Sequence, residues 1–277
     1  MLTRLALLAM AAILAFFALP TLATEAEAAD GPVNIFVVAH QDDEILMMGP
    51  DIRRHADGPG TTIVVLATDG GASNARFKLE AKLGYLPTRE DFVTHRDFEF
   101  EWTCRALGAD ICEIYPNRSR DGELTPEAAG ELFKHYAAKY PGARFKTHSW
   151  YDWHADHRTL GLALDGLRSA GIITDARFYI RTDYGRMGVN TPFPLPPHGK
   201  PTAAVGDDEQ NAYRLWAPNK AHNRYWAIGY LSTPNLFNQQ RKDPRCYVHA
   251  STAEFEVQGW WPGHAQAEAW LAKQYAK

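Results

Sequence analysis

The stretch "VNIFVVAHQDDEILMMG" (residues 33–49) decides the fold, because an unbroken apolar run stops at polar residues and a helical pattern follows. The apolar part, residues 33–39, is typical of a strand buried on both faces, as in a parallel sheet. A strand, a polar turn and a helix in this order form the first half of a β-α-β unit. The stretch therefore predicts an α/β fold.

The same alternation continues along the chain. Further apolar strands are predicted at residues 61–67, 111–115, 144–150 and 176–182. Between them lie helical patterns, of which the first is shortened or kinked by Pro50, the second is closed by Gly108 and the third begins with Thr125 and Pro126. We therefore expect a Rossmann-like, doubly wound, mainly parallel sheet with helices on both faces.

Ligands of such sheets bind outside the carboxyl ends of the strands. Several residues follow predicted strands directly and should gather at that edge: His40, Asp42, Asp43, Thr68, Asp69, Gly70, Gly71, Tyr151, Asp152, Trp153, His154 and His157. Two clusters stand out, namely "HQDDE" at residues 40–44 and "HADH" at residues 154–157.

Each cluster also has a purely structural interpretation. Two aspartates after a strand commonly cap a helix, and a lone His-x-x-His pair often arises by chance. Together the clusters supply imidazoles and carboxylates three positions apart, which share one helix face. With no thiolate among them, these ligand types suit Zn²⁺, and Fe²⁺ also fits.

The N-terminus has the features of an export signal. Arg4 precedes an apolar stretch over residues 5–19, and small residues follow Pro20. That stretch is shorter than the about 20 residues that a spanning helix needs, although a retained anchor is the alternative. We expect a signal peptide over residues 1–28 with an approximate cleavage site, a secreted or extracytoplasmic protein, and no stable membrane insertion after cleavage.

We expect the remainder, residues 29–277, to form a single domain, because 45% of the chain is hydrophobic, enough for one sizeable core. Within it, residues 185–277 lose the β-α pattern and begin with a loop rich in Pro and Gly. After this loop we expect a helix over residues 219–231, a strand within residues 254–262 and a terminal helix over residues 264–275. The formal net charge of −4 and the lack of a long basic run predict no nucleic-acid partner. The three cysteines, Cys104, Cys112 and Cys246, form no Cys-x-x-Cys motif, and their pairing stays open.

The motif "AHQDDE", followed more than a hundred residues later by "HADH", resembles the LmbE-like (PIG-L) family of zinc-dependent de-N-acetylases. "VVLATDGG" and the helix bearing Arg96, Glu99 and a closing Leu-Gly are similar to further segments of that family. The resemblance covers residues 33–183. The chain departs from the family pattern at Gln41 and Ala155, where the family usually has proline.

The resemblance implies that His40, Asp43 and His157 bind zinc, that Asp42 is the general base, and that His154 polarises or protonates the reacting groups. In such a site a zinc-activated water attacks the amide carbonyl. Residues that could contact substrate are Gln41, Asp69, Tyr151 and Trp153, and Asp156 could orient an imidazole or face solvent.

The resemblance further implies an exported amidohydrolase that removes an N-acetyl or other N-acyl group from an amino sugar or glycoconjugate. Its partner would be a small molecule or glycan with an N-acyl amine. One alternative is a metallo-hydrolase acting on N-acyl amino acids or another amide. Another is a non-catalytic secreted carbohydrate-binding protein, against which the presence of Asp42 argues, because metal binding does not require a second aspartate there.

Overall fold

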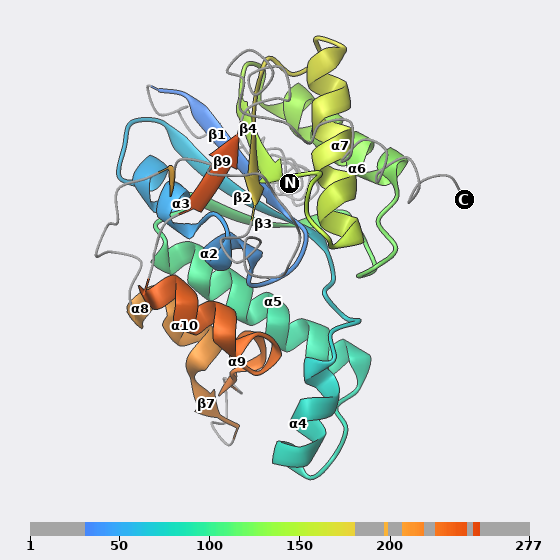
Figure 1. The fold of residues 1–277 in the computed structure, drawn as a ribbon, viewed down its shortest axis with the longest axis vertical. Coiled ribbons are helices and arrows are strands. Elements are labelled where there is room, and N and C mark those ends of the chain that lie inside the picture. Colours follow the sequence, from blue (N-terminus) through green and yellow to red (C-terminus); the bar gives the residue numbers. More distant parts are fainter. Residues whose placement is uncertain (1–30, 181–196, 199–206, 219–224, 243–245, 250–277) are drawn as a thin grey trace, which may run out of the picture.

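The computed structural model describes residues 31–180, 197–198, 207–218, 225–242 and 246–249. These residues form a layered α/β fold around one sheet (Figure 1). The expected signal peptide, most of the Pro/Gly-rich loop, and the strand and terminal helix expected after residue 250 lie outside the described residues.

The central sheet has the strand order of a doubly wound fold. Five strands, β3, β2, β1, β4 and β5, pair in parallel in that spatial order. The order reverses between β1 and β4, so the ligand crevice is expected at their carboxyl ends. On the β5 side, β9 and then β6 add antiparallel strands. The strands span β1 Val33–Val38, β2 Thr61–Thr68, β3 Ile111–Ser119, β4 Arg144–His148, β5 Asp175–Ile180, β6 Pro197–His198 and β9 Cys246–His249.

Helices cover both faces of this sheet (Figure 1). Ile35 and Val37 of β1 pack into a core shared with α6 and α7, whereas Phe36 and Val38 pack into a second core on the opposite face. The predicted fold is therefore confirmed. The helices span α2 Asp43–Leu46, α3 Gly49–Ala56, α4 Ala75–Leu83, α5 Arg89–Ala106, α6 Pro126–Lys139, α7 Ala155–Ser169, α8 Asp207–Arg214, α9 Ile228–Ser232 and α10 Pro234–Lys242.

The described part of the C-terminal third packs on the α5 side of the molecule (Figure 1). Tyr213 of α8 and Phe237 of α10 are fully buried in the same core as Phe36. A small second sheet joins β7 (Trp216–Ala217) to β8 (Tyr225–Trp226).

Local sequence chemistry explains the helix boundaries. The Thr125 side chain accepts a hydrogen bond from the backbone N–H of Ala128, with Pro126 in the first turn of α6, as predicted. Thr88 caps α5 in the same way, through the N–H of Asp91. After α5, Gly108 adopts a φ of 81°, which suits glycine best.

Three expectations about individual elements were wrong. The helix predicted around Pro50 is two helices, because Pro50 begins α3 instead of kinking a continuous helix. The third strand does not end at residue 115 but runs to Ser119, past a register irregularity opposite Leu66 and Thr68. The helix expected over residues 219–231 is, in its described part, β8 followed by the short α9.

Within the described ranges, no helix combines the length and the apolar character needed to span a bilayer. No disulfide joins Cys104, Cys112 and Cys246 within the described residues, and Cys104 and Cys246 are buried.

Candidate metal centre and catalytic site

The two sequence clusters meet at the topological switch point of the sheet. His40 follows β1, and Asp43 begins α2 directly after it. His157 lies in the first turn of α7, the helix that follows β4. Because β1 and β4 are neighbours, residues about 115 positions apart in the sequence share one crevice.

Three atoms of these side chains converge on one point. His40 Nδ1 lies 3.2 Å from His157 Nε2 and 3.3 Å from Asp43 Oδ2, and His157 Nε2 lies 3.1 Å from the same Asp43 oxygen. A tetrahedral zinc ion with bonds of about 2.0–2.1 Å places its ligand atoms about 3.3 Å apart. The spacing therefore fits a divalent cation.

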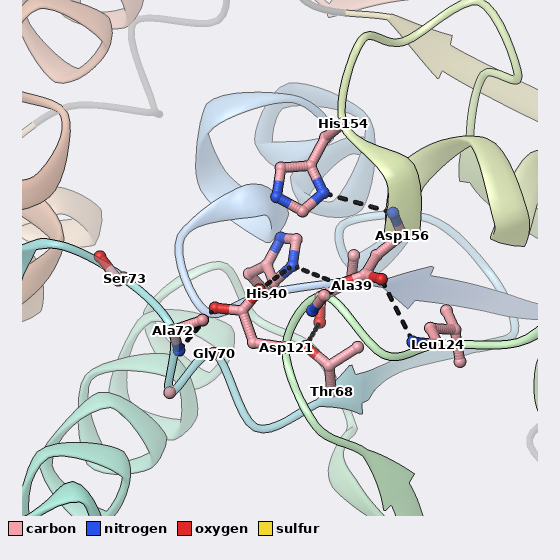
Figure 2. Close-up of polar contacts among 12 residues, drawn as sticks. Ala39, His40, Thr68, Gly70, Ala72, Ser73, Asp121, Leu124, His154 and Asp156 are labelled. Atoms are coloured by element: carbon pink, nitrogen blue, oxygen red, sulfur yellow. Dashed lines mark hydrogen bonds and ion pairs between the residues drawn. The ribbon is translucent and has the colours of Figure 1, made fainter. Parts of the chain in front are cut away.

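The outward-facing ring nitrogens show where the imidazole protons lie. His40 Nε2 lies 3.0 Å from Asp156 Oδ2 and 3.2 Å from Asp121 Oδ1 (Figure 2). His157 Nδ1 lies 3.0 Å from Asp152 Oδ2. Since a carboxylate can only accept, these partners favour the tautomers that carry the proton on the outward nitrogen. Each ring then directs a lone pair at the Asp43 oxygen, and three acceptors face one another as a cation site requires.

The electrostatics of the cluster lead to the same conclusion. Burial by itself lowers the pKa of His40, but the carboxylates of Asp121, Asp156 and Asp43 outweigh it and raise that pKa well above its usual value. Burial likewise lowers the pKa of His157, yet Asp43 and Asp152 raise it to about 9. Burial would raise the pKa of Asp43, but the neighbouring imidazoles hold it well below its usual value. The site thus attracts positive charge, whether protons or a metal ion.

His148 lies close to this cluster without joining it. Its ring stacks on that of His157 with centroids 3.8 Å apart, and its Nε2 lies 3.4 Å from Asp43 Oδ2. However, His148 Nε2 accepts a hydrogen bond from the backbone N–H of Ala39 at 3.0 Å. Its lone pair is engaged, so we assign His148 to the support of His157 and not to the ligand set.

Asp42 has an unusual backbone. Its φ is 106°, a left-handed conformation that is rare outside glycine and that clusters at functional sites. The side chain lines the cavity next to the cluster and is only 8% exposed. Burial raises its pKa to about 7, against the opposing effect of the Arg96 guanidinium, whose Nη2 lies 3.4 Å from Asp42 Oδ2.

His154 covers the cluster from the cavity side. Its ring packs edge-on against that of His40, with centroids 4.4 Å apart (Figure 2). His154 Nδ1 accepts the backbone N–H of Asp156 at 3.3 Å and so caps α7. The neutral ring therefore carries its proton on Nε2. Burial and the nearby His40 ring lower the pKa of His154 to about 4.

Arg96 ties the two loops of the site together. The guanidinium is buried and donates to the backbone carbonyl of Gly70 at 2.7 Å and to that of Gln41. A Cβ on Gly70 would lie 2.8 Å from the guanidinium, so the approach requires glycine. The loop after β1 and the loop after β2 are thus held by one side chain of α5, which also contacts Asp42.

The cluster opens into a cavity of about 440 Å³. Of the four predicted substrate contacts, only Trp153 lines it, with 52% of its surface exposed. Gln41 does not line it. Its side chain is fully buried and donates to Asp97 Oδ1 at 2.7 Å and to the Asp69 carbonyl at 3.1 Å. The structure therefore contradicts the substrate contact expected of Gln41 and makes it a brace between the loop and α5.

Asp69 and Tyr151 are also absent from the cavity lining, contrary to expectation. The Asp69 carboxylate accepts the backbone N–H of Gly71 at 2.9 Å and of Asp121 at 3.0 Å, and it pairs with Arg89. It organises the loop instead of facing the cavity. Its pKa is low because these donors outweigh the effect of burial.

Sequence reasoning missed two residues that support the ligands. Asp121 follows the extended β3, and it was overlooked because that strand was predicted to end too early. Asp152, which is fully buried against His157, follows the fourth predicted strand, but sequence reasoning gave it no role. Asp156 is 1% exposed, so of its two alternatives the structure selects the one in which it orients an imidazole. It is held in turn by the backbone N–H of Gly122 at 2.8 Å. The backbone N–H of Leu124 donates to its other oxygen at 3.3 Å (Figure 2).

Comparisons with known proteins indicate the family and the fold that this chain resembles. Residues 35–166 match the family model PIG-L, described as GlcNAc-PI de-N-acetylase. Residues 35–166, just under half of the chain, are thus similar to a PIG-L (LmbE-like) family domain, and this match supports an enzyme of the de-N-acetylase class. A comparison with curated proteins finds no match.

Solved structures share the fold at low identity. A deacetylase of the teicoplanin biosynthesis pathway, in complex with bog, is 14% identical with a TM-score of 0.54; the alignment covers 79% of this chain and 98% of that one. The same pathway's deacetylase in complex with teicoplanin is 13% identical, with a TM-score of 0.53 and the same coverage. The zinc-inhibited form of teicoplanin deacetylase Orf2 is 15% identical, with a TM-score of 0.51, again at 79% and 98% coverage.

Proposed function

We propose that this chain is an exported, zinc-dependent amidohydrolase that removes an N-acetyl or other N-acyl group from an amino sugar or glycoconjugate. The observation that carries the proposal is the convergence of His40 Nδ1, Asp43 Oδ2 and His157 Nε2 within 3.3 Å of one another, with Asp42 and His154 beside them.

These three atoms would hold the metal. Two imidazoles and a carboxylate are a donor set of hydrolytic zinc sites, and Fe²⁺ is the alternative ion for the same donors. When bound, zinc supplies a Lewis acid that polarises an amide carbonyl and lowers the pKa of a bound water to about 7.

The chain's own residues would move the protons. Asp42, buried and lining the cavity, accepts a proton from the attacking water as the new C–O bond forms. His154 presents Nε2–H to the cavity, where it donates to the oxygen that gains negative charge. When the C–N bond breaks, the leaving nitrogen takes a proton from Asp42 or His154. The products are a carboxylic acid and a free amine.

The sugar part of the proposal has separate support. A cavity of about 440 Å³ has room for more than a bare acetamide, and the exposed ring of Trp153 at its rim can stack against a sugar. The description of the matched family, GlcNAc-PI de-N-acetylase, names an N-acetylglucosamine conjugate. Structural relatives of the same fold are deacetylases of the teicoplanin biosynthesis pathway.

The proposal is tested with the purified chain loaded with Zn²⁺. It is incubated with N-acetylglucosamine oligomers and, separately, with N-acyl amino acids, and free amine is measured with and without a chelator. We expect chelator-sensitive amine release from the sugars. Release from the amino acids alone would overturn the sugar assignment, and release from neither would favour the non-catalytic alternative.

Export is tested separately. The apolar N-terminal stretch and the small residues after it support cleavage near residue 28. We expect N-terminal sequencing of the extracytoplasmic protein to start close to that position. An intact N-terminus in the cell fraction would overturn this part of the proposal.

A further inference from the structure

One wall of the cavity comes from the divergent C-terminal part of the chain. Ser232 at the end of α9, the linker residue Thr233, and Leu236 and Gln240 of α10 line the cavity together with the catalytic residues.

Two polar atoms of this wall have no hydrogen-bond partner among the described residues. They are Thr233 Oγ1 and Gln240 Nε2, and both are buried. The Gln240 side chain as a whole is only 4% exposed. A buried donor without a partner is costly, so such groups usually serve a ligand or an ordered water.

Neighbouring contacts fix the orientation of the Gln240 amide. Arg214 Nε donates to Gln210 Oε1 at 2.7 Å, and because a guanidinium can only donate, this atom of Gln210 must be oxygen. Gln210 Nε2 then donates to the Phe237 carbonyl at 3.3 Å and to Gln240 Oε1. The amide oxygen of Gln240 is therefore occupied by the hydrogen bond from Gln210. Its NH₂ group is the part of this cavity-lining residue that has no partner among the described residues.

Leu236 and Met47 add apolar side chains to the lining of the same cavity. An apolar surround strengthens a hydrogen bond and penalises a ligand that leaves the donor unmet. This wall therefore favours a ligand that places a hydrogen-bond acceptor next to the Gln240 NH₂ group. A ligand of the same size without such an acceptor should bind less tightly.

We infer that Thr233 and Gln240 form a recognition subsite that binds oxygen atoms of the substrate's amine portion, away from the scissile amide. This inference rests on the proposed function. The chemical class it names is an amine rich in hydroxyl or ether oxygens, as in a sugar ring, in contrast to an N-acylated alkyl amine.

The sharpest variant is Gln240→Glu. It keeps the oxygen that accepts from Gln210 and replaces only the cavity-facing NH₂ with an acceptor. Gln239→Glu is the matched control, because it makes the same chemical change one residue along α10, at a side chain that does not line the cavity.

The zinc-loaded enzyme is assayed with N-acetylglucosamine and with N-acetylcyclohexylamine, which lacks ring and hydroxyl oxygens. For Gln240→Glu we expect KM for the sugar to rise about tenfold or more with kcat little changed, because uniform binding is lost. KM for the cyclohexyl compound should change less than twofold, and Gln239→Glu should match the wild type. Equal effects on both compounds, or no effect on the sugar, would overturn the subsite.

Binding without turnover separates this inference from the proposed function. Metal-free protein labelled with ¹⁵N is titrated with N-acetylglucosamine, and the Gln240 side-chain NH₂ resonance is identified by its loss in Gln240→Glu. A saturable shift of that resonance supports the subsite even if no amine is ever released. An unmoved resonance overturns the subsite even if the enzyme deacetylates sugars.

Discussion

His157 Nδ1 lies 3.0 Å from Asp152 Oδ2, while the opposite nitrogen of the same ring faces Asp43 and His40. The carboxylate fixes both the tautomer and the tilt of a proposed metal ligand from five positions earlier in the chain.

Asp152→Asn should therefore weaken metal binding. The amide can turn its NH₂ toward His157 and favour the wrong tautomer, so we expect zinc affinity to fall about 10–100-fold. Competition with a chromogenic chelator measures this. As a control, Asp165→Asn alters an outward aspartate of α7 that pairs only with Arg168 in the described structure and should leave affinity unchanged. Equal affinities for wild type and Asp152→Asn would remove Asp152 from the support of the site.

Asp42→Ala should separate metal binding from turnover. Because Asp43, and not Asp42, faces the two imidazoles, we expect zinc content to persist while kcat falls by about 10²–10⁴. Elemental analysis and amine release are measured on the same sample. Loss of zinc from Asp42→Ala, with retention in Asp43→Ala, would show that the two aspartates have exchanged roles.

Gly161 lets α7 lie directly against the end of β4. A Cβ at this position would lie 2.5 Å from the Trp150 backbone nitrogen and 2.7 Å from the His148 carbonyl oxygen. We expect Gly161→Ala to lower the free energy of unfolding by about 1–3 kcal/mol, because overpacking must push α7 and His157 away from the sheet. Zinc affinity should fall with it.

Gly166→Ala is the matched test on the same helix. Nothing lies within 4 Å of its Cβ position, so the change should raise the free energy of unfolding by about 1 kcal/mol through helix propensity. Urea unfolding of both variants measures the contrast. If Gly161→Ala were as stable as Gly166→Ala, the close approach of α7 to β4 would be disproved.

Glu99 should make stability depend on pH. Burial raises its pKa to about 8, despite hydrogen bonds from the backbone N–H groups of Ile228 at 2.6 Å and Gly229 at 3.1 Å. The unfolded chain releases this proton near pH 4.5, so between pH 4.5 and 8 the folded state holds more protons. The free energy of unfolding should fall as pH rises through this window, by at most about 1.4 kcal/mol per pH unit from this group.

Glu99→Gln removes the titration, but it keeps an acceptor for only one of the two N–H groups, because these donate to different carboxylate oxygens. We expect its free energy of unfolding, from urea titrations at pH 5, 6.5 and 8, to vary less with pH than that of the wild type. An identical slope in both proteins would mean that Glu99 ionises normally.

The sequence predicts the parts of this protein that depend on local pattern. Apolar strands, the cap at Thr125, and the polar switch after residue 39 are all local, and the strand-end rule then brings His40 and His157 together. In the observed sheet β1 and β4 are neighbours, and the strand order reverses between them, so the loops after these two strands meet at one crevice.

What the sequence could not provide depends on packing between distant segments. His148 is the last residue of a buried strand, and only the stacked ring of His157 gives it a role. Gln41 was expected at the substrate, yet the nearby Asp97 carboxylate turns it toward α5. Neither contact leaves a periodic pattern in the chain.

The carboxylate of Glu99, on α5, holds the start of α9 by accepting the backbone N–H groups of Ile228 and Gly229. The cavity wall formed by α9 and α10 follows directly after this contact. Such a joint does not depend on the identity of the side chain at position 228, so the wall that follows can change composition while its anchorage stays the same. A catalytic scaffold of this kind can acquire new specificities by substitutions at the cavity-lining positions of α9 and α10, with the hydrolytic machinery left untouched.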